Sequence, residues 1–265
     1  MTRDTAAERR ALADRLEGGG KLVSPELRAA VEGVPREVFL RPGVFLPADD
    51  GLFGHPRRAP YDKVIVTCAV RRIPYTWVRQ TAPGGTILAT VGSWPYGTGL
   101  AKVTVADDGT AEGRFIGRSS FMPARSRAVP QPNGDFSART AYADTERRTS
   151  VPPGVLEDWA PAFLAQLAAP GAQLVTAVFG ADGGDAHYLF DSERESFAEL
   201  TEDSSGWTVR QGGPVALWDA VENALTAWQE AGRPDIGAVR MRVTERAHTY
   251  WIDGAPALRW EHPLV

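Results

Sequence analysis

The sequence feature that most constrains the fold is the run from Lys63 to Ala69, KVIVTCA. It is almost continuously apolar and rich in β-branched residues, as a strand covered on both faces would be. A short helix is predicted from Ile73 to Thr81, followed by an Ala-Pro-Gly-Gly turn and a second buried strand from Thr86 to Val91. Strand, helix, turn and strand make one βαβ unit, so the pattern predicts a parallel pair of strands with a right-handed crossover.

Other periodic segments predict further helices and strands, and one stretch lacks any period. Helices are expected over Thr5–Glu17, from the cap Ser24 to Glu32, over Gly154–Ala169 and over Val215–Ala231. Strands are expected at Leu100–Val105 and Thr110–Gly117, which form a hairpin, and near 173–179, 186–190, 207–211, 238–244 and 248–253. Pro, Arg, Ser, Thr and Asn dominate residues 120–153, which is typical of a loop or linker.

Composition excludes several classes of protein. The net charge of −4 gives no general attraction to nucleic acid or to an anionic membrane. Cys68 is the single cysteine, and the four scattered histidines show no metal-ligand spacing. The first residues are charged where a signal peptide would be apolar, and no apolar run reaches membrane-spanning length. We therefore expect a cytoplasmic protein that binds no metal, nucleic acid or membrane.

Three stretches carry a resemblance to a known family. VEGVPREVFLRP, residues 31–42, resembles the N-terminal segment of protein-L-isoaspartate O-methyltransferases. YDKVIVTCAVRRIPYTWVRQTAPGGTILATVG, residues 61–92, is similar to their strand-helix-strand pattern, and DDGLFGHPRRAPYD, residues 49–62, to the Gly-Asp-Gly segment before it. The match from Asp50 to Met122, with the later GGPVALWDAVENALTAWQEAGRP, more narrowly resembles the methyltransferases that accompany ATP-grasp enzymes in ribosomal peptide maturation.

The resemblance implies methyl transfer from S-adenosylmethionine to an Asp side chain of a peptide or protein. The residues implied to bind the cofactor are Asp50, Gly51 and Leu52, and those implied to bind the substrate are Val34, Pro35, Arg36, Thr67, Cys68 and Ala69. No catalytic residue is singled out. A carboxylate is already a nucleophile and a sulfonium methyl is already activated, so placing the two in line can supply much of the rate enhancement.

Each of these residues also has a structural interpretation. Asp50 would contact the adenine amino group or would be a turn aspartate before a glycine, and Leu52 would flank the adenine or fill the core. Cys68 would lie at the carboxyl edge of the sheet as a small buried residue. The segment from Val34 to Arg36 would contact substrate or would be a helix end that packs on the sheet.

One departure from the family limits the implied activity. Members carry, between the equivalents of VFLP and DDGLFGHP, a strand ending in Glu-x-Gly-x-Gly-x-Gly, a helix and a second strand ending in an acid. The glycines let the backbone approach the cofactor, and the acid holds the ribose hydroxyls. In this chain only Ala48 separates Pro47 from Asp49. Cofactor binding is therefore expected to be weak or absent.

The resulting prediction is an α/β fold with an incomplete doubly wound, Rossmann-like sheet and a C-terminal α+β region. We expect a helical substrate-facing segment (1–47), the second half of a methyltransferase-like domain (48–119), a linker (120–153) and a C-terminal domain (154–265). The edge of strand 63–69 would be open unless a homodimer partner or the C-terminal region covers it. Two functions stay open: an isoaspartyl-type carboxyl O-methyltransferase impaired by loss of the motif, or a non-catalytic peptide-binding remnant that assists an ATP-grasp maturation enzyme.

Overall fold

The computed structural model describes residues 5–22, 24–34, 51–94, 97–124, 140–178 and 185–264. The chain divides into two compact units, residues 1–49 and 50–265. The first unit contains α1 (Thr5–Gly18) and α2 (Pro25–Gly33). As predicted, Ser24 caps α2, because its hydroxyl accepts a hydrogen bond from the Leu27 amide at 3.4 Å.

Arg28 ties the two helices of the first unit together. Its guanidinium pairs with Asp14 at 2.6 Å and with Glu17 at 2.5 Å, both on α1. It also pairs with Glu32 one turn along its own helix at 2.9 Å. Both predicted N-terminal helices are therefore confirmed.

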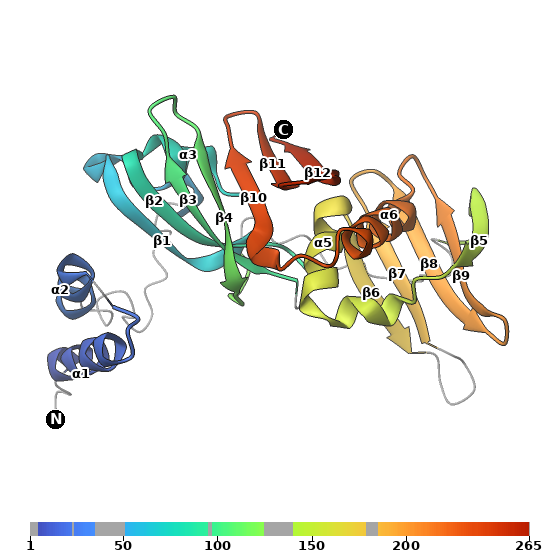
Figure 1. The fold of residues 1–265 in the computed structure, drawn as a ribbon, viewed down its shortest axis with the longest axis horizontal. Coiled ribbons are helices and arrows are strands. Elements are labelled where there is room, and N and C mark those ends of the chain that lie inside the picture. Colours follow the sequence, from blue (N-terminus) through green and yellow to red (C-terminus); the bar gives the residue numbers. More distant parts are fainter. Residues whose placement is uncertain are drawn as a thin grey trace, which may run out of the picture. The chain divides into compact units, whose positions relative to one another are not determined.

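The second unit contains a seven-stranded sheet with the order β1-β2-β3-β4-β10-β11-β12 (Figure 1). Its strands are β1 (Tyr61–Val70), β2 (Thr81–Val91), β3 (Gly99–Val105), β4 (Ala111–Arg118), β10 (Val239–Val243), β11 (Ala247–Ile252) and β12 (Ala255–Pro263). Strands β1 and β2 are parallel and are joined by α3 (Tyr75–Arg79), whereas the other pairings are antiparallel. The predicted βαβ unit, the hairpin β3–β4 and the α/β class with an incomplete sheet are confirmed.

The prediction that β1 is covered on both faces is wrong. Val64, Val66 and Cys68 pack against the core. The alternate side chains of Lys63 and Thr67 are exposed, and Ile65 keeps 57% of its surface accessible. The run KVIVTCA therefore alternates between a covered and an open face, and Ile65 conceals this alternation in the sequence. The prediction that β1 lies at the edge of the sheet is confirmed, since the C-terminal strands extend the opposite edge.

A second sheet of five strands has the order β5-β9-β8-β7-β6. Its strands are β5 (Thr145–Thr149), β6 (Gln173–Val178), β7 (Asp185–Asp191), β8 (Ser196–Asp203) and β9 (Gly206–Gly212). The helices α5 (Trp159–Ala168) and α6 (Leu217–Glu230) pack on each other, and α6 also contacts β12 of the first sheet and β8 and β9 of the second (Figure 1). Both helices therefore contribute to one continuous core, whose largest fully buried side chains include Trp94, Trp218, Tyr250, Phe115 and Phe163.

The structure differs from the expected organisation in two further ways. Strand β5 lies inside the segment 120–153 that was expected to be a linker, and β8 and β12 fall where no strand was predicted. In addition, β10 pairs with β4, so the first sheet takes strands from both sides of that segment. The pairs β5–β9 and β4–β10 join distant parts of the sequence, which a local pattern cannot reveal, whereas β8 and β12 pair with strands next to them in the sequence.

Candidate functional site

The carboxyl ends of β1 and β2 form the edge at which open α/β sheets place their ligands. Because the two strands are parallel, Val70 lies beside Val91 at this edge. Of the residues implied to bind substrate, Thr67 is exposed, Cys68 is half-buried against the core and Ala69 is 3% exposed. The structure therefore brings these three residues together on β1 but leaves only the Thr67 side chain well exposed.

A segment of the chain itself runs alongside β1 at this point. The Ala69 amide donates to the Met122 carbonyl at 2.9 Å, and the Ala124 amide donates to the Ala69 carbonyl at 2.8 Å. This is a parallel bridge centred on Pro123. A peptide that paired with β1 at Ala69 would have to displace residues 122–124.

A small basic cleft opens beyond the ends of the two strands. It is lined by Arg71 and Arg72 after β1, by Val91, Gly92 and Ser93 at the end of β2, and by Phe163, Gln166, Leu167, Pro170, Tyr250 and His262. Arg71 donates to the Pro170 carbonyl at 2.7 Å, and Arg72 donates to the Pro263 carbonyl at 2.6 Å. Burial, followed by the like charge of Arg71, lowers the pKa of the Arg72 guanidinium. The cleft therefore places two partly exposed guanidinium groups together, of which Arg71 also lies 3.9 Å from Glu193. Neighbouring cations favour an anion.

Gln166 of α5 fixes the backbone that forms one wall of this cleft. Its side-chain oxygen accepts from the Ser93 amide at 2.9 Å and from the Trp94 amide at 3.4 Å, and its nitrogen donates to the Gly97 carbonyl. The Trp94 indole in turn donates to the Ala172 carbonyl at 2.7 Å. The loop after β2 is thus held by the C-terminal half of the chain, and no local sequence signal had singled out Gln166.

Two buried histidines lie beneath the cleft. His262 donates to the Leu167 carbonyl at 2.8 Å, and burial lowers its pKa to about 4. His248 lies 3.1 Å from the Ile73 carbonyl and 3.1 Å from the Tyr250 hydroxyl, and burial lowers its pKa to about 3. Both imidazoles are therefore neutral at pH 7, and the positive charge of the cleft comes from the arginines.

The residues implied to bind the cofactor serve the fold where the structure describes them. Leu52 is 6% exposed, and its carbonyl accepts from the Thr76 hydroxyl at 2.7 Å. The Gly51 carbonyl accepts from the Trp77 indole at 2.8 Å. Asp50, like Pro35 and Arg36 of the substrate set, lies outside the described residues, while Val34 is 46% exposed in the first unit.

S-adenosylmethionine does not fit the residues that the structure describes. The cleft at the carboxyl edge has a free volume of about 20 Å³, enough for roughly one water molecule, whereas ligand pockets span about 300–1,000 Å³. The backbone of Gly92 lies close to the Gln166 side chain, because an added Cβ there would lie 2.9 Å from the Gln166 oxygen. Within the described ranges, no strand is followed by a Gly-x-Gly-x-Gly loop and a helix; β9 leads into α6 only through Gly212 and Gly213.

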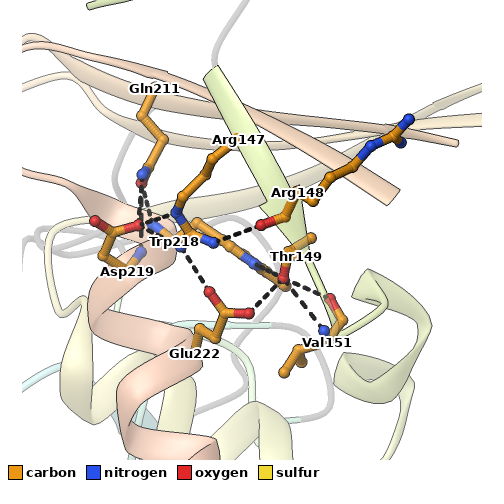
Figure 2. Close-up of polar contacts among 8 residues, drawn as sticks. All are labelled: Arg147, Arg148, Thr149, Val151, Gln211, Trp218, Asp219 and Glu222. Atoms are coloured by element: carbon orange, nitrogen blue, oxygen red, sulfur yellow. Dashed lines mark hydrogen bonds and ion pairs between the residues drawn. The ribbon is translucent and has the colours of Figure 1, made fainter. Parts of the chain in front are cut away.

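A second polar cluster joins β5 to α6 (Figure 2). Arg147 forms ion pairs with Asp219 and, at 2.6 Å, with Glu222. Glu222 also accepts from the Thr149 hydroxyl at 2.6 Å, and that hydroxyl accepts from the Trp218 indole at 3.1 Å. Each polar group drawn has a partner in the fold, so this cluster holds a strand to a helix and offers no binding site.

Gln211 completes the same cluster at the start of α6. Its side-chain oxygen accepts from the Trp218 amide at 2.6 Å, and its nitrogen donates to Asp219 at 2.7 Å. Burial alone would raise the pKa of Asp219, but the hydrogen bonds from Arg147 and Gln211 outweigh burial and lower it. Gln211 thus acts as the cap that Ala216 at the N-cap position cannot provide.

In the described part of the chain, no helix is both long and apolar enough to cross a membrane. The same residues contain no group of three or more His, Cys, Asp or Glu side chains arranged to hold a metal ion.

Comparison with known proteins places the similarity in the first part of the chain. Residues 41–129 match the family model of protein-L-isoaspartate(D-aspartate) O-methyltransferase. A protein-L-isoaspartate O-methyltransferase of Pyrococcus horikoshii is 36% identical over 74 residues, which are 28% of this chain and 34% of that protein. One from Cupriavidus necator is 31% identical over 103 residues, which are 39% of this chain and 39% of that protein. One from Hyperthermus butylicus is 38% identical over 96 residues, which are 36% of this chain and 36% of that protein.

A solved protein-L-isoaspartate O-methyltransferase covers 91% of this chain and 65% of its own length, with 17% sequence identity and a TM-score of 0.41. The chain spans between about a third and two fifths of the length of the curated relatives named above. Residues 41–129, which include the βαβ unit and the hairpin, are therefore similar to the protein-L-isoaspartate O-methyltransferase family.

Proposed function

We propose that the protein acts in the carboxyl O-methylation of Asp side chains in a ribosomally made peptide or another protein, as an isoaspartyl-type methyltransferase that uses S-adenosylmethionine. The observation that carries the proposal is the match of residues 41–129 to that family. The described part of this segment contains β1, α3, β2 and the hairpin β3–β4, and the parallel strands β1 and β2 end side by side at the carboxyl edge. Arg71 and Arg72 beside this edge suit a carboxylate-bearing substrate.

A second candidate follows from the poor fit of the cofactor. Gln166 holds the loop after β2 beside the carboxyl edge, and the Gly51 and Leu52 carbonyls accept hydrogen bonds from side chains of α3. A protein that has an edge for substrate but no binding site for the methyl donor S-adenosylmethionine would bind the peptide, and another enzyme would carry out the reaction. We propose this non-catalytic role, with an ATP-grasp peptide maturation enzyme as partner, as the alternative.

One assay separates the two candidates. The full chain is incubated with methyl-labelled S-adenosylmethionine and an isoaspartyl peptide, and in parallel with an Asp-rich peptide. Base-labile label on the peptide would establish carboxyl methylation and reject the non-catalytic role. Peptide binding by fluorescence anisotropy without label transfer, together with no calorimetric binding of S-adenosylmethionine, would reject methylation.

Thr67→Val tests whether the carboxyl edge is the place of binding. Thr67 is exposed on β1, and valine keeps its shape while removing its hydroxyl. We expect weaker peptide binding, or slower transfer, by about fivefold, since one lost hydrogen bond contributes about 1 kcal/mol. Thr104→Val on β3, also exposed, is the matched control. Equal effects of the two substitutions would place the peptide elsewhere.

A further inference from the structure

The seven-stranded sheet has one covered face and one open face. Val103, Met241 and Tyr250 on the covered face are at most 1% exposed. Their neighbours along the same strands, including Lys102 and Arg242, point to the open face and are exposed. Such alternation is typical of a sheet with one solvated face.

The strand register gathers four cations into one row on the open face. Lys102 of β3 lies opposite Arg114 of β4, and Arg114 lies opposite Arg240 of β10. Arg240 lies opposite Trp251 of β11, which lies opposite Arg259 of β12. Lys102, Arg114, Arg240 and Arg259 are called the basic row below. At the other end Lys102 pairs with Leu88, which pairs with the exposed Ile65.

The basic row is not neutralised by the fold. Among the described residues, only Arg240 of the row has a carboxylate within 4 Å: Glu112 at 3.0 Å and Asp253 at 3.6 Å. The adjacent row on the same face runs from Lys63 of β1 to Glu261 of β12. Its charges sum to zero, because it holds two cations, Lys63 and Arg242, and two anions, Glu112 and Glu261. The basic row therefore carries more positive charge than this adjacent row, although the whole chain carries −4.

Like charges directly opposite each other in a sheet destabilise it. The pairs Lys102–Arg114 and Arg114–Arg240 thus oppose folding, and a bound anion would relieve them. The Arg240 guanidinium also lies 5.9 Å from the centre of the Trp251 ring, which keeps an aromatic surface within the row. Three cations of the row, Lys102, Arg114 and Arg259, lack a carboxylate partner among the described residues, and the row ends in Leu88 and Ile65. Such a row suits an acidic partner with an apolar end.

The spacing of the row indicates the form of that partner. Neighbouring strands lie about 4.8 Å apart, so the first three cations repeat at this interval. On an α-helix, side chains three or four residues apart lie on the same face and are separated along the helix axis by about 4.5 or 6 Å. In an extended peptide, side chains on the same face are separated by ~6.7 Å. An acidic helix laid across the strands therefore matches the row better than an extended peptide does.

We propose that the open face of the first sheet is a docking surface for an acidic helical segment of a partner protein. Carboxylates of the partner pair with the basic row, and apolar residues at one end of its helix cover Leu88 and Ile65. A nucleic acid suits the face less well, because Glu112 and Glu261 would meet its phosphates in the adjacent row. The proposal does not depend on methyl transfer.

The probe is a fluorescein-labelled, alanine-based peptide of about 16 residues with Glu at every third or fourth position and Leu at one end. Its counterpart has Gln in place of Glu, and the other competitors are an extended Asp-Thr repeat and oligo(dT). Binding to the full chain is followed by anisotropy at low salt and at physiological salt. We expect the Glu peptide to bind most tightly and to weaken severalfold as salt screens the pairs.

The double substitution Lys102→Gln with Arg114→Gln is expected to weaken binding of the Glu peptide about tenfold, because each exposed ion pair contributes up to about a fivefold change. The melting temperature should hold or rise, since a like-charge pair is removed. Arg57→Gln with Arg79→Gln is the control, as both arginines are exposed but lie outside this sheet. Equal binding of the Gln peptide, tighter binding of oligo(dT), or equal effects of the two double variants would overturn the proposal.

Discussion

Replacement of Gln166 by leucine tests how the carboxyl edge of the first sheet is held together. Gln166 is 5% exposed and bonds to the amides of Ser93 and Trp94 and to the carbonyl of Gly97. Leucine fills a similar volume but makes none of these bonds. Each buried polar group left without a partner costs about 1–3 kcal/mol. The bond to Trp94 is long at 3.4 Å and adds little, so the two strong bonds predict a loss of roughly 3 kcal/mol.

The free energy of unfolding is measured by urea titration, with tryptophan fluorescence as the signal. The midpoint should fall while the slope against urea stays constant, because the surface exposed on unfolding is unchanged. Amide hydrogen exchange supplies a local readout: the Ser93 amide should lose protection before the core strands do. Gln229→Leu, at an exposed position of α6, is the matched control and should change stability by less than about 0.5 kcal/mol.

A loss below about 1 kcal/mol, with the Ser93 amide still protected, would refute this reasoning. It would mean that packing of Trp94 and Phe163 holds the loop and that the hydrogen bonds of Gln166 are dispensable.

Three further predictions concern stability. The free energy of unfolding should decrease as pH falls from 6.5 towards 4. In this range the histidines of the unfolded chain take up protons, whereas His262 and His248 of the folded protein, with pKa values of about 4 and 3, stay neutral. His262→Gln should therefore reduce the slope of the unfolding free energy against pH by about 1.4 kcal/mol per pH unit. Gly113→Ala should cost about 2–3 kcal/mol by urea titration, since its Cβ would lie 2.7 Å from the Val103 Cα atom, whereas Gly154→Ala, with open space, should be neutral. Thr149→Val should cost about 2 kcal/mol by removing the partner of Trp218 and Glu222, while Thr145→Val, exposed on the same strand, should not.

The elements that the sequence predicted are those set by nearby residues. The hairpin β3–β4 follows from Asp108-Gly109, whose Asp side chain accepts from the Thr110 amide at 2.9 Å. The first turn of α2 follows from Ser24 and Pro25. Strand β8, by contrast, contains SFAELTED, which has neither a strand period nor a helix period over its full length. It is a strand because β7 and β9 pair with it on either side.

The cleft could not have been predicted in the same way. Arg71, Ser93, Gln166 and His262 come from four separate parts of the chain, and no spacing between them signals a site. The resemblance pointed to the carboxyl edge of the sheet through Thr67 to Ala69, and the role of these residues stays a prediction. It could not show that residues 122–124 pair with Ala69, because that bridge is a single long-range contact.

The open face of the first sheet bears on what kind of protein this is. In a doubly wound sheet, helices cover both faces, and a strand then carries apolar side chains on both sides. If helices covered the open face here, Lys102, Arg114 and Arg259 would be buried without carboxylate partners, at a cost of several kcal/mol for each charge. The sequences of β3, β4, β10 and β12 are thus suited to a sheet that is bare on one side. The exposed cations of these strands fit the docking surface proposed above for the open face of this sheet.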